Sequence, residues 1–191
     1  MIVTRSTIPG VILFQPTPIR DHRGFFTRTM DVAVLESAGI DPTSFKQENQ
    51  SRSFRGGVRG LHGRLGAGEA KLARCANGSV LDVVIDARPG SATFGTVETF
   101  ILDDVEHRQV YVPHGCLHGY QALSATADFC YRSDRFYEPG EIGVNPYDPE
   151  LAIPWSEPRG QLSDKDAAAP TWQEFVHDVL GLPGPGPHAT E

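Results

Sequence analysis

The sequence predicts an all-β sandwich or barrel of the jelly-roll class, with a few short flanking helices. Between about Phe45 and Arg132, short segments rich in Val, Ile, Phe, Tyr and Thr alternate with Gly, Pro, Asn and Asp, which is typical of short strands joined by turns. Helical patterns occur only outside this region. The 191 residues, 39% of them hydrophobic, suffice for one domain. We expect that domain to span residues 1–180, followed by a flexible Gly- and Pro-rich tail over residues 181–191.

The predicted strands follow one another closely. We predict a tight hairpin at Asn77-Gly78, because this pair supplies the positive φ angles that two-residue hairpin turns need. In the strand that follows, one face is aliphatic, whereas the other carries Asp82 and Asp86 and meets water or a cation. The predicted strands span residues 45–53, 58–64, 71–77, 79–88, 97–102, 108–112, 118–123 and 127–133.

Two helices are predicted outside the β region. Asp31 is a suitable N-cap for a helix around "VAVLESA", which Gly39 ends. Thr171 and Glu174 have capping-box spacing before "FVHDVL", which Gly181 ends. Both signals rest on side chains that satisfy the free backbone groups of a helix terminus.

Charge and hydropathy limit the functional classes. The formal net charge of −7 argues against a nucleic-acid surface, which needs clustered Lys and Arg. No apolar run approaches the roughly 20 residues that span a bilayer, and the N-terminus lacks a signal-peptide pattern; we therefore expect a cytoplasmic protein. An odd set of widely spaced cysteines predicts reduced, mostly buried thiols at Cys75, Cys116 and Cys130.

Polar residues on inward strand faces mark a candidate pocket. In "FKQENQSRS", Gln47, Asn49 and Ser51 share one face, and the charged residues between them share the other, solvated face. A neutral amide-rich face is unusual for a core and suits the edge of a pocket that hydrogen-bonds a sugar or a base. The same region supplies a further group of cationic and acid–base side chains: Arg59, His62, Lys71, His118 and Tyr131.

These residues favour acid–base chemistry without a metal. Cupin-type jelly rolls often hold iron or manganese through a second imidazole two residues after the first, but Arg64 stands there. In its place, His62 is a suitable base for a carbon-bound proton next to a ketone, and Tyr131 can return a proton from the opposite face. Lys71 would stabilise the enolate oxygen. Such a set inverts stereocentres next to a carbonyl, and no cofactor is expected.

At these residues the sequence closely resembles the dTDP-4-dehydrorhamnose 3,5-epimerase family, which are metal-free cupins. The resemblance runs from about Ile8 to Pro170 through "DHRGFF", "QENQSRS", "VRGLHG", "VPHGCLHGYQAL", "DFCYRSDRFYEPGE" and "LSDKDAAAP". It implies a cupin jelly roll that acts on dTDP-4-keto-6-deoxy-D-glucose or a close relative. It also implies a homodimer in which strands and nucleotide-site residues are exchanged across the interface.

The resemblance assigns roles to individual residues. His62 is similar to the proton-abstracting base, Asp166 to its hydrogen-bond partner and Tyr131 to the proton donor. Lys71 and His118 match residues around the 4-keto oxygen and the sugar ring. The positions that match the thymidine diphosphate site are Arg23, Phe26, Gln47, Asn49, Arg59, Tyr137, Glu141 and Lys165.

Several positions depart from the family pattern, among them the loop between Tyr137 and Glu141, which is one residue short, and "VNPYDP", where an aromatic residue usually precedes the Asp. Gly63 and Arg64 follow the histidine where an aromatic residue and Gln are usual, and Arg28 places a cation where a carboxylate usually helps to set the nucleotide site. These changes leave open whether C3, C5 or both are inverted, so a mono-epimerase is an alternative. A non-catalytic nucleotide-sugar binding protein and a metal-dependent cupin are the others; Arg64 disfavours the last.

Overall fold

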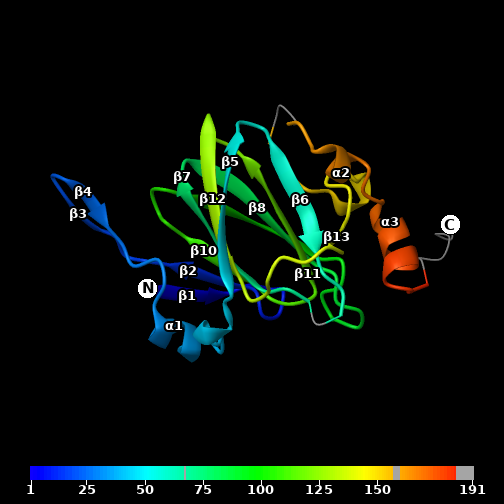
Figure 1. Ribbon diagram of the computed structural model, residues 1–191, viewed down its shortest axis with the longest axis horizontal. Helices are drawn as coiled ribbons and strands as arrows, with labels where there is room; N and C mark the ends of the chain where they lie inside the picture. Colours follow the sequence, from blue (N-terminus) through cyan, green and yellow to red (C-terminus); the bar gives the residue numbers. More distant parts are fainter. Residues whose placement is uncertain (67, 157–159, 184–191) are drawn as a thin grey trace, which may run out of the picture.

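Two antiparallel sheets pack face to face in the computed structural model, which describes residues 1–66, 68–156 and 160–183 (Figure 1). The predicted all-β class is confirmed. The six-stranded sheet has the order β1 (Ile2–Arg5), β2 (Ile12–Gln15), β10 (Gln109–Val112), β7 (Lys71–Asn77), β12 (Thr126–Ser133) and β5 (Gln47–Phe54). The five-stranded sheet has the order β13 (Ile142–Gly143), β6 (Val58–Gly63), β11 (Cys116–Ala122), β8 (Ser79–Asp86) and β9 (Val97–Asp103).

The predicted hairpin at Asn77-Gly78 is wrong, because the two strands it joins lie in different sheets. β7 pairs with β10 and β12, whereas β8 pairs with β11 and β9. Gly78, with φ +78°, carries the chain between the sheets. A Cβ atom there would lie 2.2 Å from Ser124 Oγ. The glycine correctly marks a turn, but turn chemistry does not decide which strands pair.

Both faces of β8 are buried. Its aliphatic face, around Val83, packs under the C-terminal segment with Trp172 and Phe175. Its other face lies between the sheets, where burial is tolerated because each carboxylate has a partner. Asp82 contacts His118, and Asp86 accepts hydrogen bonds from Arg88 and two nearby hydroxyl groups. Of the two partners expected for this face, water or a cation, Asp86 has the second in the Arg88 guanidinium.

The structure adds four strands before Phe45 that the sequence pattern did not predict. β1 is exposed along its whole length, so it carries no inward alternation. The two-stranded arm of β3 (Ile19–Asp21) and β4 (Gly24–Phe26) projects from the sandwich (Figure 1). Its residues are exposed, including Phe26 at 67%. β2 does alternate between buried and half-buried residues, but a strand of four residues gives too weak a signal, and the three exposed strands have no alternating apolar face at all.

Short helices flank the sheets, as expected. α1 (Val32–Ser37) begins at Asp31, which accepts a hydrogen bond from the Val34 backbone N–H. α3 (Trp172–Glu174) begins with the predicted capping box and continues as a π-helical turn, η3 (Phe175–Val179). Three further short elements are α2 (Asp164–Ala167), η1 (Pro42–Ser44) and η2 (Pro149–Leu151).

The structure describes only the first residues of the predicted C-terminal tail, residues 181–183. Leu182 packs against the apolar cluster beneath the five-stranded sheet. The rest of the predicted flexible tail, residues 184–191, lies outside the described residues.

Among the helices that the structure describes, none is long and apolar enough to cross a membrane.

Close approach of β6 and β11 requires glycine at Gly60. Its φ is +120°, and an added Cβ would lie 2.6 Å from Gly119 Cα. We expect Gly60→Ala to lower the free energy of unfolding by about 2–4 kcal/mol, because strain and a backbone clash act together. Urea denaturation measures the change. Gly24→Ala is the control, since its φ of +128° is equally unfavourable but nothing lies within 4 Å of the added atom; equal losses would contradict the clash.

Candidate active site

A cleft of about 730 Å³ opens between the two sheets and α2. Eleven of the fourteen site residues predicted from the sequence line it: Gln47, Asn49, Arg59, His62, Lys71, His118, Tyr131, Tyr137, Glu141, Lys165 and Asp166. The remaining three, Arg23, Phe26 and Arg28, do not. Arg23 and Phe26 belong to the exposed arm and Arg28 follows it, pairing with Asp31. The predicted site residues of one chain therefore lie in two separate places: eleven line the cleft, and three lie on the arm or directly after it.

His62 is held in the cleft between two carboxylates. It lies on β6, opposite Gly143 of β13 and His118 of β11. Its Nε2 is 2.6 Å from Oδ1 of the buried Asp166, and its Nδ1 is 3.5 Å from Glu141 Oε1. Ser163 caps α2 and so fixes the helix that carries Asp166. The buried carboxylate on Nε2 orients the imidazole and fixes its tautomer. Nδ1 is the nitrogen left for proton transfer, because its distance to Glu141 exceeds that of a hydrogen bond.

Tyr131 enters the cleft from the opposite sheet. It lies on β12 between Asn49 of β5 and Ala73 of β7, and Lys71 Nζ is 5.5 Å from the centre of its ring. Burial raises the pKa of the Tyr131 phenol, and the negative charges of Glu69 and Glu141 act in the same direction. The phenol thus holds its proton at neutral pH and is suited to donate it.

The raised pKa of Tyr131 predicts a late alkaline limb in the pH dependence of turnover. An ordinary phenol has a pKa of 10.0, so the folded protein keeps the donor protonated beyond that pH. The same shift stabilises the fold below about pH 10, and this contribution disappears as the pH rises through the folded pKa. A pH–rate profile measures it. Loss of activity through this group well below pH 10 would contradict the burial argument.

A buried polar network supports the floor of the cleft. His118 Nε2 lies 2.9 Å from Asp82 Oδ2. Tyr120 OH lies 2.9 Å from the hydroxyl oxygens of both Ser51 and Ser53. Arg59 Nε donates a 2.9 Å hydrogen bond to Ser53 Oγ. Ser53 and Tyr120 were not predicted as site residues, although Ser53 continues the alternation of the neutral face of β5.

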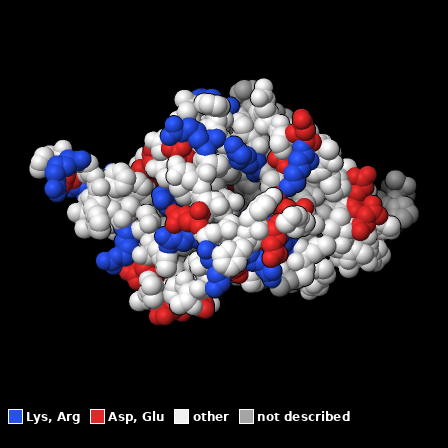
Figure 2. Space-filling model, viewed as in Figure 1, with Lys and Arg blue, Asp and Glu red and all other residues white. Residues whose placement is uncertain are grey.

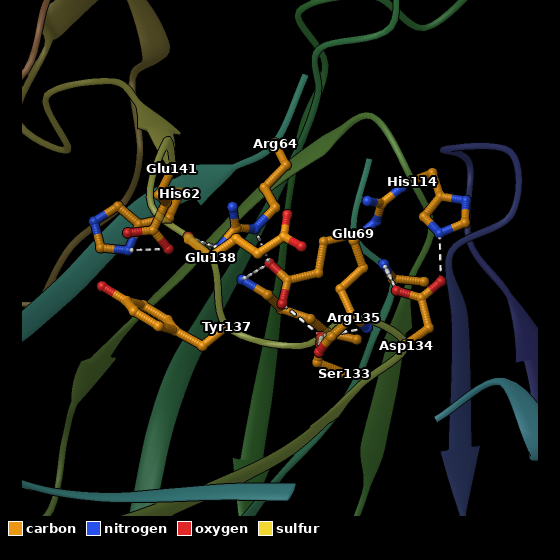
Figure 3. Close-up of polar contacts among 12 residues, drawn as sticks. His62, Arg64, Glu69, His114, Ser133, Asp134, Arg135, Tyr137, Glu138 and Glu141 are labelled. Carbon is orange, nitrogen blue, oxygen red and sulfur yellow. Dashed lines mark hydrogen bonds and ion pairs between the residues drawn. The ribbon is translucent and has the colours of Figure 1, made fainter. Parts of the chain in front are cut away.

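Glu69 is another residue that the sequence prediction missed. It lies close to Lys71 at one end of the cleft. Figure 3 shows it with two further partners, Arg64 and Ser133. Nothing in the sequence singled it out, since it follows a Gly-rich turn. This end of the cleft is therefore lined by a cluster of charged side chains, Arg64, Glu69 and Lys71, and not by Lys71 alone. In the part of the chain that the structure describes, no three His, Cys, Asp or Glu side chains are grouped as metal ligands.

The cleft gathers positive charge in an otherwise acidic protein. Besides Lys71, it is lined by Arg52, Arg59 and Lys165. Arg52 is paired with Asp128, and Lys165 with Glu141. Figure 2 shows basic side chains on the upper part of one face and on the projecting arm, interspersed with acidic ones. A cleft with this charge suits an anionic ligand.

Comparison with known proteins identifies close relatives along most of the chain. Residues 5–174 match the dTDP-4-dehydrorhamnose 3,5-epimerase family. The Pseudomonas aeruginosa dTDP-4-dehydrorhamnose 3,5-epimerase is 42% identical over 87% of this chain and 93% of its own. A dTDP-4-dehydrorhamnose 3-epimerase from Streptomyces niveus is 43% identical over 85% of this chain and 79% of its own.

Solved structures agree with the sequence relatives. NovW, a 4-keto-6-deoxy sugar epimerase from the novobiocin gene cluster of Streptomyces spheroides, superposes with a TM-score of 0.90 at 41% identity, covering 96% of this chain and 93% of that one. The Legionella pneumophila 3,5-epimerase in complex with dTDP-4-keto-L-rhamnose gives a TM-score of 0.87 at 37% identity, covering 96% and 98%. These likenesses confirm the predicted jelly-roll fold.

Proposed function

Since the chain belongs to the dTDP-4-dehydrorhamnose 3,5-epimerase family, whose members are isomerases acting on carbohydrates, we propose that it epimerises dTDP-4-keto-6-deoxy-D-glucose or a close relative. One observation carries the proposal. His62, paired with Asp166, and Tyr131 enter one cleft, and the strands that carry His62 and Tyr131 belong to opposite sheets. A sugar ring between them would meet a base on one face and an acid on the other, which is the arrangement that inversion of a carbon centre needs.

The reaction begins with proton abstraction next to the ketone. His62 takes the proton from the carbon, and the electron pair of the broken C–H bond forms an enolate with its charge on the 4-keto oxygen. The Lys71 ammonium stabilises this charge, as a positioned cation does in a site screened from water. Tyr131 then delivers its phenolic proton to the other face of the same carbon. Exchange with water restores both side chains.

The other half of the cleft binds the nucleotide in this proposal. Asn49 and Gln47 offer amide groups, and Arg59 offers a guanidinium that Ser53 already orients. A diphosphate is well matched by such a forked donor. We propose that Arg23, Phe26 and Arg28, which lie outside this chain's cleft, act in the cleft of a second copy within a homodimer. Sedimentation of the wild type and of an Arg23→Ala variant, with dTDP affinity for each, tests this assignment.

Inversion at C3 alone is a second candidate. Both the Streptomyces niveus 3-epimerase and ChmJ, a 3'-monoepimerase from Streptomyces bikiniensis solved with dTDP-quinovose, are similar to this chain, at 43% and 34% identity. Double inversion requires the sugar ring to change its conformation between two steps, so the shape of the sugar end of the cleft selects the outcome.

Proton NMR in deuterium oxide tests the proposal directly. We expect dTDP-4-keto-6-deoxy-D-glucose to lose its C3 proton signal in the presence of the protein. Loss of the C5 signal as well would identify a 3,5-epimerase, and retention of it a 3-epimerase. Saturable binding of the substrate with no exchange at either carbon would refute the proposal in favour of a non-catalytic nucleotide-sugar binding protein.

A further inference from the structure

Two cations of the cleft face the same oxygen of one carboxylate. Glu69 Oε2 lies 3.5 Å from Arg64 Nε and 3.6 Å from Lys71 Nζ, and the three side chains are only 10–12% exposed. The other oxygen, Oε1, accepts a 2.6 Å hydrogen bond from Ser133 Oγ. Figure 3 shows Arg64 and Ser133 beside this carboxylate. With two positive groups and one negative group, the cluster keeps one positive charge inside the cleft.

Glu69 and Lys71 do not form a tight pair. Both distances to Oε2 exceed the usual 2.7–3.2 Å of a hydrogen bond. Arg64 is anchored separately, because its Nη2 donates a 2.6 Å bond to the Glu138 backbone carbonyl. Its buried Nε has no hydrogen-bond partner among the described residues. The interaction between Arg64 and Glu69 is therefore one of charge, and it acts on the same carboxylate oxygen as the lysine.

We propose that Arg64 is a positioning residue that competes with Lys71 for Glu69 and so keeps the Lys71 ammonium free for the enolate oxygen. The inference rests on the proposed function, because the enolate is the charge that the ammonium meets. Without the guanidinium, Glu69 would exert its whole charge on Lys71, since charges in a partly shielded site interact strongly. A fully paired ammonium offers less to a developing oxyanion.

Removal and rescue test the competition. We expect Arg64→Met to lower kcat about tenfold with little change in KM, which corresponds to a modest loss of transition-state stabilisation. Adding Glu69→Gln should restore kcat to within about threefold of the wild type, because the competing charge is gone. Arg64→Lys keeps the charge and should retain most activity. The exposed Arg5 of β1 supplies the matched control, Arg5→Met.

Two results would overturn the proposal. Unchanged turnover in Arg64→Met would show that the guanidinium does not matter. A loss that persists in the double variant would show that Arg64 acts only by holding the backbone at Glu138.

A second readout needs no substrate. Reductive methylation of Lys71, followed by peptide mass spectrometry of the free protein, should be slower in Arg64→Met and return to the wild-type rate in the double variant, since a paired ammonium releases its proton less readily. If this order holds while the wild type exchanges no substrate proton, the charge competition stands and the proposed reaction fails. If the wild type is active but all variants are methylated equally, the competition fails and the reaction stands.

Discussion

Replacement of His62 by Ala is expected to lower turnover about 10³-fold, within the range that a positioned general base contributes. The variant keeps the nucleotide half of the cleft, so dTDP should bind with nearly unchanged affinity. The loss would then lie in proton abstraction and not in recognition. Proton exchange by NMR measures the first quantity, and isothermal titration calorimetry with dTDP measures the second.

A surface histidine provides the control for this experiment. His114 Nε2 lies 2.5 Å from Asp134 Oδ2, so it resembles the His62–Asp166 pair, but it is about half exposed and does not line the cleft. His114→Ala should leave turnover unchanged. Wild-type turnover in His62→Ala would refute the assignment of the base. A parallel loss of dTDP affinity would point instead to a collapse of the cleft around the buried Asp166.

Much of the cleft could be predicted from local pattern. The neutral face of β5 was visible because a strand alternates with a period of two, and the structure places that face in the cleft. The capping residues of α1 and α3 were equally predictable, because a cap is a contact between residues that are close in sequence. The roles of His62 and Tyr131, in contrast, depended on considering several segments together.

Features made by distant pairing were not predictable. The turn at Gly78 has the chemistry of a hairpin, but each strand next to it finds a better partner elsewhere in a jelly roll. Glu69 acquires its importance only because Ser133 of β12 lies opposite Lys71 of β7, which no local pattern encodes. Arg23 illustrates another limit, since its position on the exposed arm, outside this chain's cleft, is a matter of three-dimensional placement that no local pattern encodes.

Tyr131→Phe should separate the two halves of the reaction. His62 would still remove the proton from carbon, but the enolate could be protonated only from the face where His62 lies. The substrate should therefore gain deuterium while keeping its starting configuration, and inverted product should form about 10²-fold more slowly. The NMR experiment in deuterium oxide reports both quantities in one spectrum.

Tyr111→Phe is the matched control for Tyr131→Phe. Tyr111→Phe removes another half-buried phenol of the same sheet, one whose pKa is also raised by burial but which does not line the cleft, and it should epimerise normally. Undiminished inversion in Tyr131→Phe would mean that another group donates the proton. An equal loss of exchange and inversion would place Tyr131 in the first step, beside Lys71 on the enolate oxygen. Exchange without inversion is the result that only a donor on the opposite face can explain. It requires that His62 still removes the proton and that the enolate still forms, while the group that protonates the opposite face is missing.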